Sequence, residues 1–234
     1  MSISGPDKSS LAAFVEGVWT DTAPVRIVGM PLATTMTVLR LDGGGLLVYS
    51  PIPLTPTRRA AVEALGTVVH LYAPSLFHDR WIEEWAAAFP AARVHAPARL
   101  AKRRPTLRID RSPTAAAEPA FAGVIDEVHV DGCRLDETVL FHRPSRVLVV
   151  ADLVHNIGRP PGLWTRLYAG TMGFYDRVAV SRAIRWGAFP DRAAARRSVD
   201  AVLQLAFDAV VVGHGAPIRA GGQEALANAY RWLR

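Results

Sequence analysis

Three apolar stretches of the chain are each followed by residues that commonly bind metal ions. The residues in question are His78, Asp79, Asp152 and His214. Buried strands of a shared sheet end at one edge, so these side chains are expected to converge there. Imidazoles and carboxylates around an open coordination position suit zinc, iron or manganese, and such an ion lowers the pKa of a bound water towards neutrality. The pattern indicates a metal site, although each residue alone could equally cap a helix or complete a turn.

The elements that must place these residues follow from hydrophobic periodicity and turn signals. Alternating residues on both sides of Asp42–Gly45 predict a hairpin of 35–41 with 46–50. Thr55 as a cap and Gly66 as a stop mark the ends of a helix. Strands are also expected at 14–19, 25–28, from 68 onwards, and at 92–95, 124–130, 137–142, 146–151 and 209–212, and helices at 55–65, 81–89, 191–207 and 223–233. Strands interleaved with helices predict an α/β domain.

A mixed segment at 158–187 interrupts this regular pattern. It carries several aromatic residues, among them Trp164, Tyr168, Tyr175 and Trp186. These side chains could form a cap or insertion over a site, or a small satellite core, and they would also suit a homodimer contact. We treat residues 1–234 as a single domain in which this segment and the loops after the strands build any substrate pocket.

Composition narrows the classes of partner. The chain has 234 residues, of which 50% are hydrophobic, so it can bury a sizeable core. The net charge of +6 suggests nucleic acid, but the arginines are spread along the chain. The densest basic run, 99–111, has no interleaved aromatic residues and is expected to be a solvated face. A small-molecule substrate is therefore expected, and neither nucleic acid nor a membrane.

Cysteine content and the N-terminal sequence bear on the compartment. Cys133 is the only cysteine, which excludes an internal disulfide and fits a reducing environment. The first residues show no basic flank followed by an apolar run, and no segment reaches about 18 uninterrupted apolar residues. We expect a cytoplasmic protein.

The ordered motifs resemble the metallo-β-lactamase superfamily. The phrases that carry the resemblance are Tyr72-Ala-Pro-Ser-Leu-Phe-His-Asp79, Gly132-Cys133, Leu148-Val-Val-Ala-Asp152 and Val212-Gly-His-Gly-Ala-Pro217. Together with the phrase 49–54 and the predicted hairpin, they cover nearly the whole chain and are similar to a bacterial branch of unassigned function. The resemblance implies a four-layer αβ/βα sandwich of two mixed sheets between helices, with metal at the shared strand edge.

The chain departs from the superfamily motif His-x-His-x-Asp-His. In the best registration, Pro74 and Leu76 take the places of the first two histidines, and neither can coordinate a metal. His78 and Asp79 fall on the last two positions in swapped order, and Cys133 falls where a middle histidine is usual. The resemblance therefore implies that only a second-site set remains, formed by His78, Asp79, Asp152 and His214.

Four further residues are secondary candidates. Cys133 is a possible soft ligand, although a lone cysteine is more often a small buried apolar residue. His129 could hydrogen-bond to Cys133 or Asp152 and so orient a ligand without binding the metal itself. His155 could reach the site from the loop that carries Asp152, and Asn156 could orient a substrate. Of the other histidines, His70 is expected to be a hydrogen-bonded core residue, and His95 and His142 are expected on the surface.

The expected function is a metal-dependent hydrolase with one divalent metal, zinc in preference to iron or manganese. The ion would activate a water against a small ester, thioester, lactone or phosphoester, with Asp152 and Asp79 as the catalytic carboxylates. An alternative is a non-catalytic or redox relative that uses the same fold to bind a ligand or a partner protein. A nuclease is less favoured, because superfamily nucleases use the two-metal site that Pro74 and Leu76 would abolish.

Overall fold

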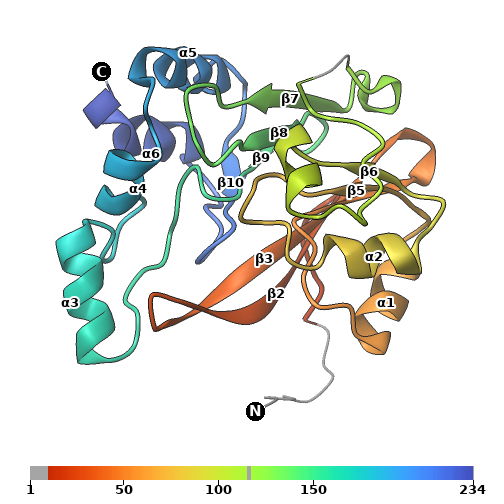
Figure 1. Ribbon diagram of the computed structural model, residues 1–234, viewed down its shortest axis with the longest axis horizontal. Coiled ribbons are helices and arrows are strands. Elements are labelled where there is room, and N and C mark those ends of the chain that lie inside the picture. Colours follow the sequence, from red (N-terminus) through yellow and green to blue (C-terminus); the bar gives the residue numbers. More distant parts are fainter. Residues whose placement is uncertain (1–9, 115–116, 234) are drawn as a thin grey trace.

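Two mixed β-sheets pack face to face, and helices cover both outer faces (Figure 1). The computed structural model describes residues 10–114 and 117–233. The predicted α/β class and the four-layer arrangement of two mixed sheets between helices are confirmed.

The first sheet contains six strands in chain order. They are β1 (Ala12–Val15), β2 (Val18–Ile27), β3 (Met30–Arg40), β4 (Leu46–Tyr49), β5 (Val68–Tyr72) and β6 (Arg93–His95). The strands β1 to β4 pair antiparallel, and β4 to β6 pair parallel. Parallel neighbours need a crossover connection, which here contains α1 (Pro56–Glu63) and then α2 (Ile82–Ala88).

The second sheet contains four strands in the order β10-β9-β8-β7. The strands are β7 (Ile125–His129), β8 (Thr138–His142), β9 (Val147–Val149) and β10 (Ala209–Val211), and the helices α3 (Leu163–Met172), α4 (Arg182–Gly187) and α5 (Arg192–Leu203) lie between β9 and β10 in the chain. The helix α6 (Gly222–Ala229) follows β10. Only β9 and β10 pair parallel, and the other pairs are antiparallel. Short 3-10 turns are η1 (Asp42–Gly44), η2 (Ala98–Lys102), η3 (Pro119–Phe121) and η4 (Arg231–Leu233).

The apolar core has three layers that follow from this stacking. Between the two sheets lies a cluster that includes Leu47, Tyr72, Leu140 and Val149. A second cluster packs the outer face of the first sheet against α1 and α2, and a third packs the outer face of the second sheet against α5 and α6. Removing this apolar surface from water is the main favourable term that holds the sheets and helices together.

Local sequence signals explain the best-predicted elements. The hairpin turns at Gly43 and Gly44, whose φ angles of +76° and +84° favour glycine. The helix α1 begins at Pro56, and the Thr55 side chain accepts a hydrogen bond from the backbone N–H of Arg58. The predicted bounds of this helix, 55–65, lie within two residues of the observed ones, whereas β3 starts at Met30, five residues before the predicted start of the hairpin.

The two short strands expected at 14–19 and 25–28 are wrong in their bounds: a turn at 16–17 separates β1 from one long strand, β2, that covers most of the rest. The strand β2 pairs with β3 without interruption from Val18 to Ile27. The polar stretch inside it resembled a break, but its aspartate is buried: Asp21 Oδ2 lies 2.7 Å from Arg58 Nε of α1. An ion pair with a helix distant in sequence therefore allows a charged residue in the strand.

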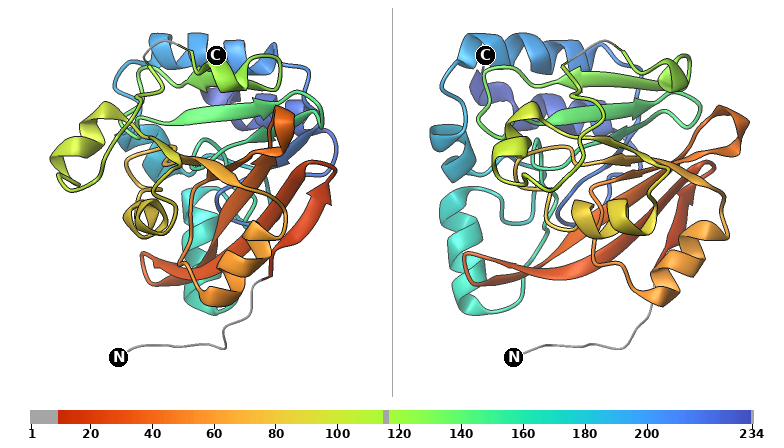
Figure 2. Two further views of the ribbon diagram at one scale, coloured as in Figure 1. Left: turned by 90° about the vertical axis from the view of Figure 1, so that its right-hand side faces the viewer. Right: turned by 45° about the vertical axis from the view of Figure 1, so that its right-hand side comes forward.

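The long hairpin of β2 and β3 reaches out to α3 (Figure 2). At this contact, Met30 belongs to a small buried cluster with Ala169, Phe174 and Ala179. The segment 158–187 thus packs on the hairpin tip. Within the described ranges, no helix has the length and apolar character needed to cross a membrane.

Two histidines expected on the surface are buried, and those expectations are wrong. His142 lies between Ser145 Oγ at 2.6 Å and the carbonyl oxygen of Arg40 at 3.0 Å. His95 is fully buried and hydrogen-bonded to His70. Such partners allow a polar ring to leave water without losing its hydrogen bonds. The expectation of a hydrogen-bonded core role for His70 is confirmed.

Candidate metal centre

Three of the predicted ligands converge beyond the ends of strands from both sheets, in the turns after β5, β9 and β10. His78, Asp152 and His214 each offer one ligand atom, and these atoms lie within 4.8 Å of one another. Asp152 Oδ1 is central, at 3.5 Å from His78 Nε2 and 3.6 Å from His214 Nε2. All three residues are buried. The arrangement presents two imidazole nitrogens and one carboxylate oxygen to a common point.

His78 is positioned by a tight loop after β5. The Ser75 hydroxyl accepts hydrogen bonds from the backbone N–H groups of Phe77 and His78. The same loop is tied to the second sheet, because Pro74 O accepts from Thr138 N and Leu76 N donates to the Leu135 carbonyl. The two motif positions that carry no imidazole thus serve to join the sheets.

Asp152 is positioned by a buried carboxylate at the start of β8. The oxygens of Glu137 accept hydrogen bonds from the backbone N–H groups of Ala151 and Asp152, at 2.8 and 2.9 Å. Burial, together with the nearby charge of Asp152, raises the pKa of Glu137 to about 7. Glu137 therefore holds the turn after β9 that presents Asp152.

His214 is positioned by the tight approach of the β10 turn to the β9 turn. Gly213 N donates to the Ala151 carbonyl at 3.2 Å. A Cβ atom on Gly213 would lie 2.5 Å from that carbonyl oxygen and 2.8 Å from Cε1 of His78. Only glycine fits here, so this residue brings two ligand-bearing turns together.

Hydrogen bonds also orient both imidazole rings. His214 Nδ1 lies 2.8 Å from the carbonyl oxygen of Ala33 and must donate to it, which leaves Nε2 unprotonated towards Asp152. His78 Nδ1 lies 2.7 Å from Ser50 Oγ. Metal-binding histidines generally have such a partner on the second ring nitrogen.

The charge states follow from burial and mutual contact. Burial would raise the pKa of Asp152, but the imidazoles of His78, His214 and His155 lower it well below its usual range. Burial lowers the pKa of His214, and it lowers that of His155 to about 4. Burial also acts to lower the pKa of His78, but the facing carboxylate of Asp152 outweighs it and raises that pKa.

Asp79 stands apart from this group. Its Oδ2 accepts a hydrogen bond from Arg104 Nε at 3.1 Å, and Arg104 also contacts Glu83. Successive residues of the loop thus face different neighbours: His78 faces Asp152, and Asp79 faces the arginine. The structure brings together three of the four predicted ligands and holds the fourth in an ion pair.

The secondary candidates occupy distinct environments. Cys133 packs beside the outer core of the second sheet, and burial raises the pKa of its thiol to about 12. His129 contacts Thr138 Oγ1 at 3.1 Å and lies 3.5 Å from Asp136. The amide of Asn156 donates to the backbone carbonyl of Ala216.

His155 is the secondary candidate that lies beside the three ligands. Its ring centroid is 5.7 Å from that of His214. Its Nδ1 is buried and has no hydrogen-bond partner among the described residues. A buried polar atom without a partner is unusual in a folded protein and marks a place where an ion or water is needed.

The donor set fits a divalent metal ion. Two imidazoles and a carboxylate match the three-protein-ligand sites of catalytic zinc, with a further position left open. The ring orientations are already fixed by Ser50 and the Ala33 carbonyl. The group can therefore hold a metal without rearrangement of the backbone.

A pocket of about 380 Å³ opens onto these ligands. His78, Asp152 and His214 all line it. Its apolar walls include Val25, Ile27, Phe77, Trp81 and Ile184, and Arg26 and Arg80 add positive charge. The β2–β3 hairpin and the segment 158–187 both contribute, so a small organic molecule could reach the ligand group.

Sequence reasoning missed the residues that support the ligands. In the sequence, Ser50 stands only within the phrase 49–54, and Glu137 only at the start of a predicted strand. The Ala33 carbonyl carries no side-chain signal at all. A buried acid at the first position of an apolar strand, as at Glu137, is the one signal that could have been found.

Several solved structures share this fold over nearly their whole length. The chain is similar to the metallo-beta-lactamase from Pontibacter korlensis, with 13% identity and a TM-score of 0.66 over 97% of this chain and 99% of that one. The DIM-1 metallo-beta-lactamase exposed to ceftazidime aligns with 12% identity and a TM-score of 0.66, over 97% and 98%. VMB-1 aligns with 12% identity and a TM-score of 0.63, over 96% and 99%.

The fold is that of the metallo-β-lactamases, and the resemblance read from the motifs is confirmed. A search of the curated proteins finds no significant match. The family model described as Domain of unknown function (DUF4336) matches residues 16–182, and the chain belongs to that family.

Proposed function

We propose that this protein is a metal-dependent hydrolase that uses one divalent ion held by His78, Asp152 and His214. The observation that carries the proposal is the convergence of these three side chains on the floor of an apolar pocket. Pro74 and Leu76 offer no ligand where the superfamily motif has imidazoles, and this favours one ion over two. Zinc is preferred over iron or manganese for a small set of nitrogen and oxygen ligands with an open position.

The ion would supply a water of lowered pKa and a positive charge for the developing oxyanion. The chain's own residues do the rest. Ser50 and the Ala33 carbonyl keep the two imidazoles in the orientation that faces Asp152. Asp152 stays ionised, so its negative charge would balance part of the charge of the ion. Glu137 accepts a hydrogen bond from the backbone N–H of Asp152 and holds it in place.

The pocket walls indicate the substrate class. Val25, Ile27, Phe77 and Trp81 would pack against an apolar acyl group, whose burial contributes about 25 cal/mol per Å². The guanidinium groups of Arg26 and Arg80 would attract a negative group on the substrate. A small ester, thioester or lactone that carries an anionic group fits best, and a phosphoester fits the arginines but makes less use of the apolar walls.

Turnover by reconstituted protein tests the proposal. Metal-free protein would be loaded with zinc, iron(II) or manganese and assayed with p-nitrophenyl acyl esters, acyl thioesters, lactones and bis-p-nitrophenyl phosphate. Hydrolysis is expected from the loaded protein, with loss of at least about 100-fold in kcat/KM in Asp152→Asn. Ser145→Ala, which removes a hydroxyl partner of the distant His142, is the matched control and should keep full activity.

Two outcomes would overturn the proposal. Equal turnover by wild type and Asp152→Asn would place the reaction elsewhere. Stoichiometric metal binding at His78, Asp152 and His214 without turnover of any ester class would favour the alternative, a non-catalytic or redox relative that binds a ligand in the same pocket.

A further inference from the structure

A second group of metal-binding residue types lies in the parallel half of the first sheet. His70 of β5, His95 of β6 and Glu118 before η3 each offer one ligand atom, and these atoms lie within 4.8 Å of one another. All three residues are buried. The cavity that His70 lines shares no lining residue with the pocket at Asp152, so this group is separate from the proposed hydrolytic site.

The two imidazoles contact each other directly. His70 Nδ1 lies 2.8 Å from His95 Nε2. On the other side of the His95 ring, Arg111 Nη1 lies 3.4 Å from Nδ1. A guanidinium can only donate, so Nδ1 of His95 accepts and its Nε2–H donates to His70. One proton therefore lies between the two rings, at the place where an ion shared by both would lie.

Glu118 supplies a carboxylate with one oxygen that lacks a hydrogen bond. Its Oε1 accepts from Arg93 Nη1 at 2.9 Å. Its Oε2 is buried and has no hydrogen-bond partner among the described residues, although it lies 2.8 Å from the same nitrogen. The Arg93 side chain is 48% exposed, so it can swing into solvent and release the carboxylate.

The surroundings of the group favour neutral imidazoles. Burial lowers the pKa of His95 to about 3, and it also lowers the pKa of His70. Both rings are thus neutral near pH 7, which is the form that binds metals. The charge of Arg111 is compensated by Glu127, whose Oε2 lies 2.6 Å from Nη2, so the pair leaves little net charge beside the rings.

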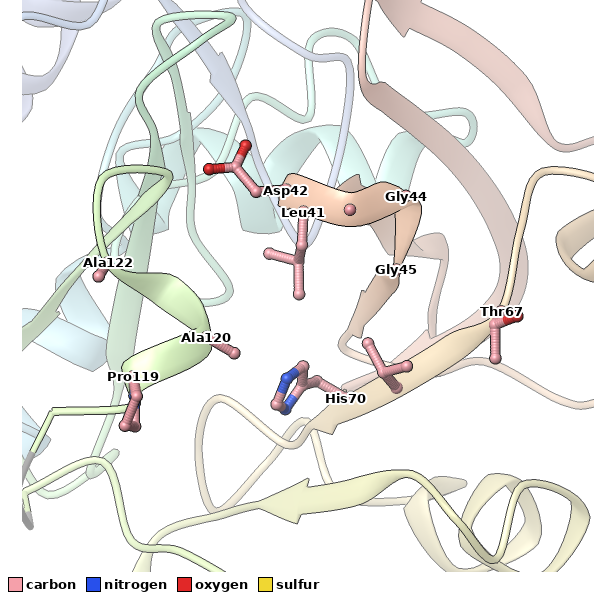
Figure 3. A pocket seen from close by; sticks show the side chains of 11 residues that line it. Leu41, Asp42, Gly44, Gly45, Thr67, His70, Pro119, Ala120 and Ala122 are labelled. Carbon is pink, nitrogen blue, oxygen red and sulfur yellow. The ribbon is translucent and has the colours of Figure 1, made fainter.

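A cavity gives access to the group from outside. It has a volume of about 540 Å³ and lies between the turn 41–45 and the segment 119–122. The ring of His70 points into it, opposite Pro119 and Ala120 (Figure 3). An ion beside His70 could therefore enter, and could keep a water as a further ligand.

We propose that His70, His95 and Glu118 form a second divalent-cation site, suited to zinc, that fastens the segment before η3 to the strands β5 and β6. For the ion to bind Nε2 of His95, the proton there moves to Nδ1 of the same ring, while Arg111 turns from that ring and keeps its contacts with Glu127. Arg93 moves from Glu118 into solvent. At Zn–N distances of about 2.0–2.1 Å, tetrahedral ligands lie about 3.3 Å apart, so the two nitrogens need to separate by only about half an ångström.

Titration with Co(II) and Zn(II) tests the site in the full chain. The background variant is His78→Ala/His214→Ala, in which the proposed hydrolytic site is removed. This variant is expected to bind one ion per chain and to show the visible absorption of tetrahedral Co(II). His95→Gln and Glu118→Gln added to it should each weaken binding by at least about 10-fold.

Arg93→Ala separates a metal site from a purely structural network. Because Arg93 competes with the ion for Glu118, its removal in the same background should tighten binding several-fold. His142→Gln, which alters a buried histidine outside both groups, should leave binding unchanged, and urea unfolding checks that each variant folds.

The proposal fails if the His78→Ala/His214→Ala background binds no ion, or if His95→Gln and Arg93→Ala leave its affinity unchanged. The result does not depend on the proposed hydrolase function, since the ligands of that site are absent throughout the test.

Discussion

Ser50 Oγ lies 2.7 Å from Nδ1 of His78, and it links the end of β4 to a ligand that follows β5. Both residues are buried, and Ser50 has a φ angle of +54°, which is uncommon for a residue other than glycine. A strained backbone held at a contact to a ligand indicates that the contact matters for the site.

Ser50→Ala should weaken metal binding at the His78 group by about 10- to 100-fold, because the ring of His78 loses the partner that orients it. Isothermal titration with zinc measures the change. Ser145→Ala removes a comparable hydroxyl from His142 and should leave the zinc affinity within about twofold of wild type. Equal affinities for Ser50→Ala and wild type would show that packing alone positions His78.

Asp152→Asn and Asp79→Asn should differ sharply in metal content. Asp152 lies between the two imidazoles, so its amide variant should lose at least about 100-fold in affinity, or about 2.7 kcal/mol. Asp79 is paired with Arg104, so its variant should keep the metal within about threefold. Elemental analysis after dialysis against chelator compares the two. Loss of metal in Asp79→Asn would restore the four-ligand set predicted from the motif.

Gly213→Ala should cost both stability and metal, because its Cβ would meet the carbonyl oxygen of Ala151 at 2.5 Å and the ring of His78 at 2.8 Å. We expect a loss of about 1–3 kcal/mol in the free energy of unfolding. Gly170→Ala is the control: it lies inside α3 with no atom within 4 Å of its Cβ and should stabilise the protein by about 0.5–1 kcal/mol. Urea denaturation measures both.

Arg58→Met should lower the free energy of unfolding by about 3–5 kcal/mol, because it leaves Asp21 buried without its guanidinium partner. The neighbouring Arg59→Met removes an exposed pair with Glu63 and should cost less than about 1 kcal/mol. Both are measured by urea denaturation at pH 7. Similar costs for the two variants would mean that Asp21 has sufficient other hydrogen bonds.

His95→Gln should alter the acid sensitivity of the metal-free protein. Burial lowers the pKa of His95 to about 3, so the unfolded chain binds the proton first as the pH falls below about 6.5. His95 therefore contributes stability above pH 6.5 that is lost between about pH 6.5 and 3. The advantage of wild type over the variant should shrink by a few kcal/mol between pH 7 and pH 4. A constant difference in unfolding free energy across these pH values would contradict the assignment.

Local signals made much of the fold predictable. The turn at Gly43 and Gly44 and the cap at Thr55 each involve only neighbouring residues, so the turn and the helix could be placed from sequence. The strand β2 could not be placed in full, because Asp21 is tolerated only through Arg58, which lies on a helix distant in the chain.

The convergence of three candidate ligands was also predictable from the sequence. The position of Asp79 and the supporting hydrogen bonds were not, because they depend on residues distant in the chain. His78, Asp152 and His214 follow buried strands, and strand ends meet at an edge. Asp79 turns away because Arg104 lies near it in space, and the sequence alone does not reveal this neighbour. The support from Ser50 and the Ala33 carbonyl depends on strand register, which no local pattern specifies.

The ligands of the candidate metal centre come from both halves of the chain. His78 follows a strand of the first sheet, whereas Asp152 and His214 follow strands of the second. Neither half alone carries a complete set of donors, so an N-terminal fragment ending before β7 could not retain the ion by itself. An ion bound only by the assembled halves would raise the free energy needed to separate them.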